Sequence, residues 1–158
     1  MRNLSKVLHL IGLVMFMGSI LSFIAMNSFV GASTDAVLIS HQRQFVSTIT
    51  WALTIPGMWI LVIAGCLTAL SGKYVLTEHR WLAGKLVLAV LILINATFFI
   101  STLVGQVTGI AEQSAIQGQL LSTYMPLKAK EDMYGIANFL MILVSILLAI
   151  YKPGSKRQ

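Results

Sequence analysis

The sequence predicts an all-α membrane protein, a bundle of four transmembrane helices with both termini in the cytoplasm. Hydrophobic residues make up 57% of the 158-residue chain and charged residues only 10%, whereas soluble domains carry about 25% charged residues. The mean hydropathy is +0.85. A soluble domain of this size cannot bury so much apolar surface, so we expect the chain to form a single integral membrane domain with the lipid bilayer as its partner.

Four apolar segments have the length of membrane helices, and they cover residues 7–30, 45–70, 82–104 and 134–151. Crossing about 30 Å of hydrocarbon takes roughly 17–25 helical residues. Backbone groups in lipid must hydrogen-bond within their own segment, which favours helices. The first segment has about twice the apolar length of a signal-peptide core, usually 7–15 residues, so we expect a retained helix.

Basic residues predict the orientation of the bundle. Most of them lie on the side that the two termini share: Arg2, Lys6, Lys73, Arg80, Lys85, Lys152, Lys156 and Arg157. Only Arg43, Lys128 and Lys130 belong to the other side. Because cytoplasmic loops carry an excess of Lys and Arg, this asymmetry predicts cytoplasmic termini. The net charge of +6 forms no basic stripe with interleaved aromatic residues, so we expect no nucleic-acid partner.

A polar outer loop is predicted over residues 105–133, between the third and fourth helices. Within it, Ile116, Leu120, Leu121 and Tyr124 recur at helical spacing. Two interpretations are open. The segment is an interfacial helix lying on the outer surface, or it continues the third helix above the membrane.

Two ionisable residues lie near the cytoplasmic ends of predicted helices, and such residues are functional candidates. His9 shares a helix face with Gly12, where a small residue leaves room for a flat ligand such as haem, and histidine is a common axial ligand of haem iron. Lys85 lies at a similar depth, and its ammonium suits a propionate or another anion. The alternatives are that Gly12 permits close helix packing and that both charged residues extend to the interface.

Further polar candidates occupy the second and third helices. Ser47, Thr50 and Thr54 form a polar stripe. Either their hydroxyls bond neighbouring carbonyls, or the stripe lines a cavity open to the outside, with His41 and Arg43 at its mouth.

Pro56 and Asn95 lie near the middle of the second and third predicted helices. Pro56 predicts a kink in the second helix, and Asn95 is a polar candidate within the third. All five acidic residues fall in predicted connections, which argues against a buried carboxylate relay. No hydrolytic or phosphate-binding motif is present, so the catalytic residues of any enzyme are unknown.

Three short motifs together resemble a known superfamily. His9 and Gly12 open the first helix, HQRQF (residues 41–45) precedes the second, and WLAGKL (residues 81–86) opens the third, with Asn95 ten residues after Lys85. The pattern is similar to small four-helix membrane proteins that include the copper-resistance protein CopD, the HemJ-type protoporphyrinogen oxidases and an uncharacterised integral-membrane branch. The resemblance covers residues 5–105.

The resemblance implies a bundle of the bacterial inner membrane that binds haem b or another porphyrin in a redox or accessory role. His9 and Lys85 match functional positions of the HemJ branch. Asn95 replaces a histidine of that branch, and the arginine pair of CopD is reduced to Gln42-Arg43, which weakens the case for catalysis and for copper transport. Two alternatives are an accessory subunit without a cofactor, in a homo-oligomer or membrane complex, and a protoporphyrinogen-oxidase-like enzyme that passes electrons to a quinone.

Overall fold

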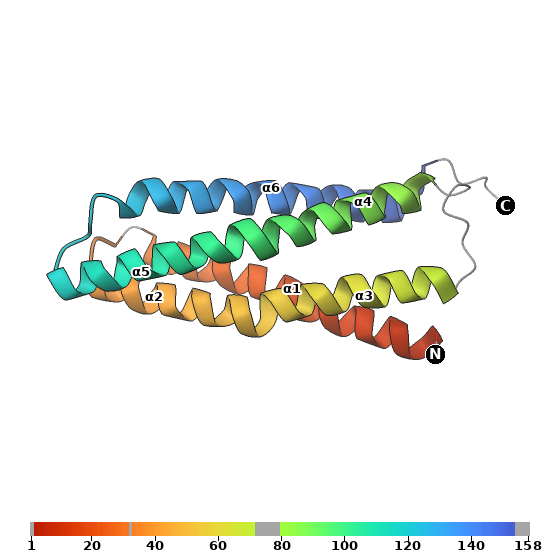
Figure 1. Cartoon of the computed structure of the whole chain (residues 1–158), viewed down its shortest axis with the longest axis horizontal. Helices are drawn as coiled ribbons and strands as arrows, with labels where there is room; N and C mark the ends of the chain where they lie inside the picture. The colour runs from red at the N-terminus through yellow and green to blue at the C-terminus, as the bar shows by residue number, and fades with distance from the viewer. Residues whose placement is uncertain (1, 32, 72–79, 154–158) are drawn as a thin grey trace.

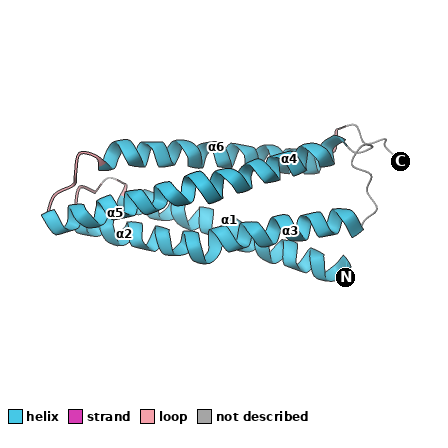
Figure 2. Cartoon of the chain, viewed as in Figure 1, coloured by secondary structure: helices cyan, strands magenta, loops and turns pink. Residues whose placement is uncertain are grey.

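Every regular element of the described chain is helical. The computed structural model describes residues 2–31, 33–71 and 80–153 (Figure 2). The helices are α1 (Arg2–Val30), α2 (Ala36–Ile49), α3 (Ile55–Ser71), α4 (Arg80–Ile94), α5 (Ser101–Gln117) and α6 (Tyr124–Tyr151). Two π-helical turns join them in pairs: η1 (Thr50–Thr54) joins α2 to α3, and η2 (Asn95–Ile100) joins α4 to α5.

The helices form four rods that lie along one long axis (Figure 1). The rods are α1, α2–η1–α3, α4–η2–α5 and α6. We call the end where α1 begins and α6 ends the terminal end, and the end where α1 leads to α2 and α5 leads to α6 the distal end (Figure 1). This arrangement confirms the predicted all-α, four-helix bundle. Which side of the membrane the terminal end faces stays a prediction.

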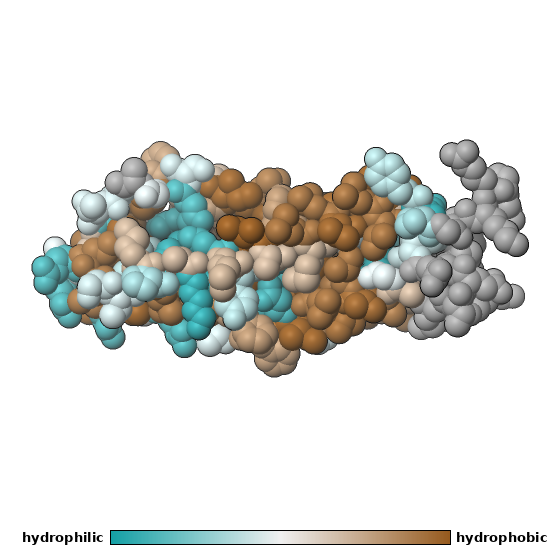
Figure 3. Space-filling view, turned by 90° about the horizontal axis from the view of Figure 1, so that it is seen from above, coloured by the Kyte–Doolittle hydropathy of each residue, from teal (hydrophilic) through white to brown (hydrophobic). Residues whose placement is uncertain are grey.

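All four rods are long and apolar enough to cross a membrane, over Asn3–Val30, Ala36–Ala69, Trp81–Gln117 and Tyr124–Tyr151. Large hydrophobic side chains point outward along them, and Figure 3 shows an apolar surface over the middle of the bundle. Hydrophilic side chains gather toward the distal end of the same face (Figure 3). These features are those of a multi-pass integral membrane protein in contact with lipid.

The distal end departs most from the sequence prediction. The predicted outer loop over residues 105–133 is wrong, because α5 reaches Gln117 and α6 begins at Tyr124, so residues 118–123 alone connect them. The 37-residue rod Trp81–Gln117 is about 55 Å long at 1.5 Å per residue, well over the ~30 Å of hydrocarbon. Of the two interpretations that the sequence left open for this segment, the continuation of the third helix is the one that the structure shows, as far as Gln117.

Helix boundaries at the distal end follow from local chemistry. The Asp35 carboxylate accepts hydrogen bonds from the backbone N–H groups of Val37 and Leu38, at 2.9 and 3.2 Å, and so caps α2 nine residues before the predicted start at 45. Gly118 ends α5 with a φ of +70°, a conformation that glycine adopts without strain. The helical spacing of residues 116–124 therefore does not mark one helix.

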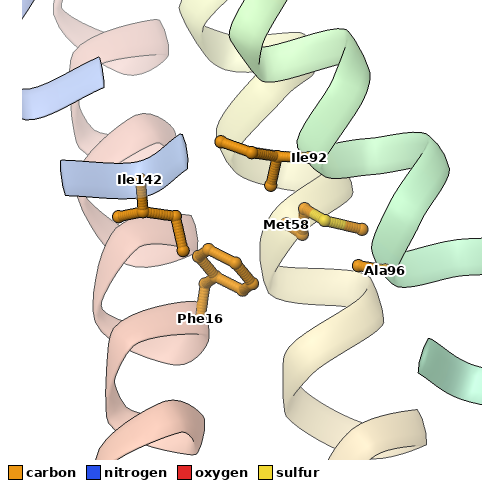
Figure 4. Packing of buried hydrophobic residues seen from close by; sticks show 5 residues of the cluster. All are labelled: Phe16, Met58, Ile92, Ala96 and Ile142. Carbon is orange, nitrogen blue, oxygen red and sulfur yellow. The ribbon is translucent and has the colours of Figure 1, made fainter. Parts of the chain in front are cut away.

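Two buried clusters hold the rods together. The central cluster consists of Phe16, Met58, Ile92, Ala96 and Ile142, and Figure 4 shows its side chains meeting from all four rods. The distal cluster consists of Val30, Ile39, Val107, Ala111 and Tyr124. Around them α1 packs mainly on α3, α2 on α5, and α6 on α4 and α5.

Candidate functional site: a cavity with a buried arginine

A cavity of about 510 Å³ lies between the four rods in the distal half of the bundle. Its walls are mostly apolar, and at its terminal end they share Phe16, Ala96 and Ile142 with the central cluster. Polar side chains gather at the other end, where Asn27 and Arg43 line it. The cavity therefore has an apolar body near the middle of the bundle and a polar head toward the distal end.

Both π-helical turns contribute to the wall of the cavity, Thr50 and Thr54 from η1 and Ala96 and Ile100 from η2. Turns of this kind are rare and occur often at functional sites. The turn η1 ends two residues before Pro56, which has no N–H to donate into the helix. The π-helical turn η1 therefore lies next to Pro56, the position at which the sequence predicted a kink.

The threonines of the predicted hydroxyl stripe bond within their own rod, as the first interpretation has it, and they also line a cavity. Thr50 donates a hydrogen bond to the Val46 carbonyl at 2.8 Å, and Thr54 donates to the Ile49 carbonyl at 3.4 Å. Both residues also line the cavity, whereas Ser47 does not. The two threonine hydroxyls are therefore satisfied within their own rod, and both side chains are buried among the residues that line the cavity.

Asn95 fixes the third rod to α6. Its side-chain amide donates to the Tyr134 carbonyl and to Oδ1 of Asn138, both at 3.1 Å. Asn138 is buried and lines the cavity, and the rings of Phe99 and Tyr134 stack at 5.3 Å in the same contact. The predicted polar candidate Asn95 therefore positions the cavity wall on α6 and does not line the cavity itself.

The polar head of the cavity is built on an ion pair between α2 and α6. Nη1 of Arg43 lies 3.2 Å from Oε1 of Glu131, and Nη2 lies 2.6 Å from Oε2. Their side chains are 1% and 11% exposed. The expectation that all acidic residues lie in connections was wrong, because Glu112, Glu131 and Asp132 belong to α5 and α6. Both residues were predicted at the mouth of a cavity open to the outside: Arg43 does line the cavity but is buried inside the bundle, while His41 is exposed and does not line it.

One nitrogen of Arg43 has no partner within the described part of the chain. Nε is buried without a hydrogen bond, although Arg43 lines the cavity. Thr97 Oγ1 is the other such buried atom among the described residues, but Thr97 does not line the cavity. A buried donor left without an acceptor costs about 1–3 kcal/mol, more for a charged group. Arg43 therefore brings an unsatisfied donor to the group of residues that line the cavity.

The cavity opens toward lipid between α1 and α6. The lining residues Ile24 on α1 and Ile136 and Phe139 on α6 are also exposed at the surface. These two rods pack against α3 and against α4 and α5, and not closely against each other. An apolar molecule dissolved in the bilayer can therefore reach the cavity from the side.

The predicted pair His9 and Gly12 lies outside this cavity, at the contact of α1 with α3. His9 Nδ1 donates to the Leu61 carbonyl at 2.9 Å. A Cβ added at Gly12 would lie 2.6 Å from the Leu61 nitrogen and 2.7 Å from the Gly57 oxygen. The space beside Gly12 is thus occupied by the backbone of α3, and close packing is the role that the structure shows for this glycine.

Lys85 lies on a different contact from His9. It is half-buried on α4, whose neighbour Gly84 faces Leu148 of α6. Nearby, Lys152 stacks its ammonium over the Trp81 ring at 5.7 Å, an arrangement typical of the membrane interface. Neither His9 nor Lys85 lines the cavity.

Haem does not fit the cavity by the chemistry of its walls. No histidine, cysteine or methionine is among the residues that line it, so iron placed there would lack its usual axial ligands. Within the described residues, no group of three or more His, Cys, Asp or Glu side chains is placed to hold a metal ion. Haem binding at His9 stays a prediction about another part of the molecule.

Sequence reasoning did not identify Glu131 or Gly135 on the α6 wall. The signal that identifies them is the spacing of Glu131, Gly135, Asn138 and Ile142, which places polar and small residues on one helix face that continues into an apolar segment. All four line the cavity. Assigning residues 105–133 to a loop concealed this face.

Comparisons with protein-family models, with curated proteins and with solved structures find no match. The resemblance to the CopD and HemJ superfamily therefore rests on the sequence motifs alone and stays a prediction.

Proposed function

We propose that the protein binds an apolar small molecule dissolved in the membrane, in the cavity between its four rods. The observation that carries the proposal is the cavity itself, about 510 Å³ with apolar walls and a buried polar head. Small-molecule sites are typically concave, 300–1,000 Å³ in volume, and mostly apolar with a few placed polar groups. The opening between α1 and α6 gives such a molecule access from lipid.

The free-energy cost of an empty cavity supports the presence of a bound molecule. Unfilled space inside a protein forfeits contacts of the side chains around it. Residual cavities destabilise by about 24 cal/mol per Å³ in a measured mutant series. An apolar ligand or a lipid chain recovers part of that loss without any large change in the fold.

The orientation of the bundle adds a direction to the proposal. We infer from the excess of basic residues at the terminal end that this end faces the cytoplasm. The polar head of the cavity then lies near the outer face of the membrane, and the apolar body lies toward its middle. A bacterial inner membrane, as the motif resemblance implies, fits this arrangement.

Photolabelling of the protein in phospholipid nanodiscs tests the proposal. The probe is a long-chain alkyl diazirine, which carries no polar group, and labelled residues are mapped by peptide mass spectrometry. We expect label on deep lining residues such as Ile142 and Ile20 in addition to lipid-facing positions. Label confined to the outer surface, at the level found for exposed Val14 or Leu147, would contradict it.

A matched pair of glycine variants controls the labelling. Gly135 lines the cavity and a Cβ added there meets nothing within 4 Å, so Gly135→Leu places a side chain in the cavity. Gly105 is exposed on α5, and its added Cβ also meets nothing within 4 Å. We expect deep label to fall several-fold in Gly135→Leu and to stay unchanged in Gly105→Leu. Equal labelling of the two variants would count against binding in the cavity.

Haem or porphyrin binding at His9 is a second candidate function. The hydrogen bond from Nδ1 to the Leu61 carbonyl favours the tautomer whose Nε2 lone pair is free for a metal. Because α3 fills the Gly12 face, the macrocycle would lie on the outer side of the α1–α3 contact. Lys85 has no role in this geometry unless a second copy of the chain supplies it.

Absorption spectra test the second candidate. The purified protein, expressed with added haem, is compared with His9→Ala in oxidised and dithionite-reduced states. A Soret band lost in the variant would support axial ligation by His9. A colourless protein would remove this candidate, together with the protoporphyrinogen-oxidase-like alternative that depends on the same residues, and would leave the accessory-subunit alternative.

A further inference from the structure

We propose that the ligand of the cavity carries a neutral carbonyl group, which accepts a hydrogen bond from Nε of Arg43. This inference rests on the proposed function, because it names the head group of the molecule bound in the same cavity. Three properties of the polar head support it. Nε of Arg43 has no acceptor, the charges of Arg43 and Glu131 neutralise each other, and Arg43 lies at one end of the cavity.

The free donor comes from the geometry of the ion pair. Glu131 uses Nη1 and Nη2 of Arg43, at 3.2 and 2.6 Å, and leaves Nε without an acceptor. The arginine side chain is 1% exposed, so bulk water does not supply one. The guanidinium is therefore held by one carboxylate, and Arg43, whose Nε has no acceptor, is one of the residues that line the cavity.

The cancelled charge determines what kind of acceptor fits. Arg43 and Glu131 neutralise each other, and Asp132 is the only other charged residue that lines the cavity. An anionic head group would meet this carboxylate without an unpaired cation. A cationic head group would find both oxygens of Glu131 already bound to Arg43, and the Asp132 carboxylate already paired with Lys128. A neutral acceptor uses Nε and meets neither obstacle.

The depth of Arg43 determines where the carbonyl lies. On α1 the cavity runs from Asn27 at the polar head to Phe16 in the central cluster, a rise of about 16 Å at 1.5 Å per residue. About 20 helical residues cross the hydrocarbon, so counting from the terminal end places Arg43 and Asn27 near the distal membrane boundary. The geometry fits a molecule with its carbonyl at the boundary and its apolar chain directed to the bilayer centre.

Two sources supply this chemistry, the acyl ester of a bilayer lipid and a free lipophilic carbonyl compound. Nanodiscs of ether-linked phosphatidylcholine, which has no carbonyl, separate them from nanodiscs of the ester-linked lipid. If the ester is the natural ligand, labelling of the cavity by the alkyl diazirine is several-fold weaker in ester-linked discs. If a free compound is the ligand, the two lipids give equal labelling.

Competition in ether-linked nanodiscs tests the carbonyl directly. The competitors are an alkane, a methyl ketone and a carboxylate of equal chain length. We expect the ketone to suppress cavity labelling at a concentration about tenfold lower than the alkane, as one hydrogen bond to a charged donor predicts. We expect the carboxylate to be no better than the alkane. Equal potency of ketone and alkane would overturn the inference, whereas loss of cavity labelling altogether would overturn the proposed function first.

Variants of the ion pair test the assignment to Nε. Arg43→Lys keeps a cation for Glu131 and removes the Nε donor, so the advantage of the ketone should fall to less than about twofold while the alkane competes as before. The double variant Arg43→Met with Glu131→Met removes the donor without leaving a buried charge, and gives the same test if Arg43→Lys does not fold.

The control is a double variant one residue away. Gln44 donates to Glu112 at 3.0 Å between α2 and α5, on a surface that does not line the cavity. Gln44→Met with Glu112→Met should retain the full advantage of the ketone. An advantage that survives in both Arg43 variants, or is lost in the control as well, would overturn the role of Nε.

Discussion

The two halves of the bundle are held together by different means. In the terminal half, α1 meets α3 through backbone contact at Gly12 and Gly57, and His9 adds a hydrogen bond to a main-chain carbonyl. In the distal half, the rods enclose a cavity beside the distal cluster, and the Arg43–Glu131 ion pair joins α2 to α6 across the polar head. Helix packing in the terminal half therefore requires glycines, which have no side chain, whereas packing in the distal half requires two particular charged side chains.

This difference explains where a ligand site lies in so small a protein. Close contact of two backbones leaves no volume between them, as the occupied space beside Gly12 shows. Side chains that reach across from opposite rods, such as Arg43 and Glu131, hold a spacing that backbone contact does not allow. Different substitutions should thus destabilise the two halves. A larger side chain should destabilise the terminal half, and removal of a charge should destabilise the distal half.

The largest effect is expected from Glu131→Gln. The change leaves the guanidinium of Arg43 buried without a counter-charge, and breaking a buried pair in this way costs about 3–5 kcal/mol. The free energy of unfolding, measured by SDS titration in mixed micelles with helical circular dichroism, should fall by this amount. Glu112→Gln, which weakens the exposed contact with Gln44, should cost less than about 1 kcal/mol. Similar losses in the two variants would show that the ion pair is not buried in the membrane protein.

A smaller loss is expected from Gly12→Leu. The first side-chain atom would lie 2.6 and 2.7 Å from backbone atoms of α3, so the two helices must separate. Overpacking of this kind costs about 1–3 kcal/mol. Gly18→Leu on the same helix is the control, because its added Cβ meets nothing within 4 Å. The same titration should show Gly18→Leu unchanged or slightly stabilised, and a matching loss at both glycines would contradict tight packing at Gly12.

The sequence was sufficient for the fold because lipid imposes a simple requirement. A rod that crosses hydrocarbon must be apolar over about 20 residues, and all four rods were identified from that property. Composition does not distinguish a helix that extends into water from a loop, however. The segments 105–117 and 124–133 are helical and polar, so both were assigned to the outer loop.

The site was predictable on α2 but not on α6. Thr50, Thr54 and Arg43 share a helix face that the sequence shows directly, and they line the cavity. Glu131 pairs with Arg43 across 88 residues of sequence, and nothing in either segment alone specifies that pairing. For His9 and Lys85, the predicted depth in the membrane was similar, but the two residues do not lie together. The reason is that α1 packs on α3, whereas α4 packs on α6.

A loss of about 1 kcal/mol is expected from Asn95→Leu, which removes both hydrogen bonds that tie η2 to α6. Interhelical hydrogen bonds in membranes contribute about 0.6 kcal/mol on average. Thr102→Val is the control, because Thr102 is exposed and bonds only to the Phe98 carbonyl of its own rod. Asn95→Leu should also weaken photolabelling of the cavity, since Asn138 on its wall loses a partner. An unchanged label pattern would show that this contact does not shape the cavity.

The smallest effect, a gain in stability, is expected from Gly135→Leu. Replacing glycine by a good helix former stabilises a helix by about 0.5–1 kcal/mol, and Gly105→Leu should show this gain alone. At Gly135 the new side chain also enters the cavity, so its gain should exceed that of Gly105→Leu in delipidated micelles. A ligand that binds only the folded protein stabilises the wild type by mass action and is excluded by the leucine. The long-chain ketone should therefore stabilise wild type and Gly105→Leu but not Gly135→Leu. The stability advantage of Gly135→Leu over wild type should shrink when ketone is added. Its advantage over Gly105→Leu should become smaller still or reverse. A difference that ketone does not alter would mean that the cavity is filled by its own side chains.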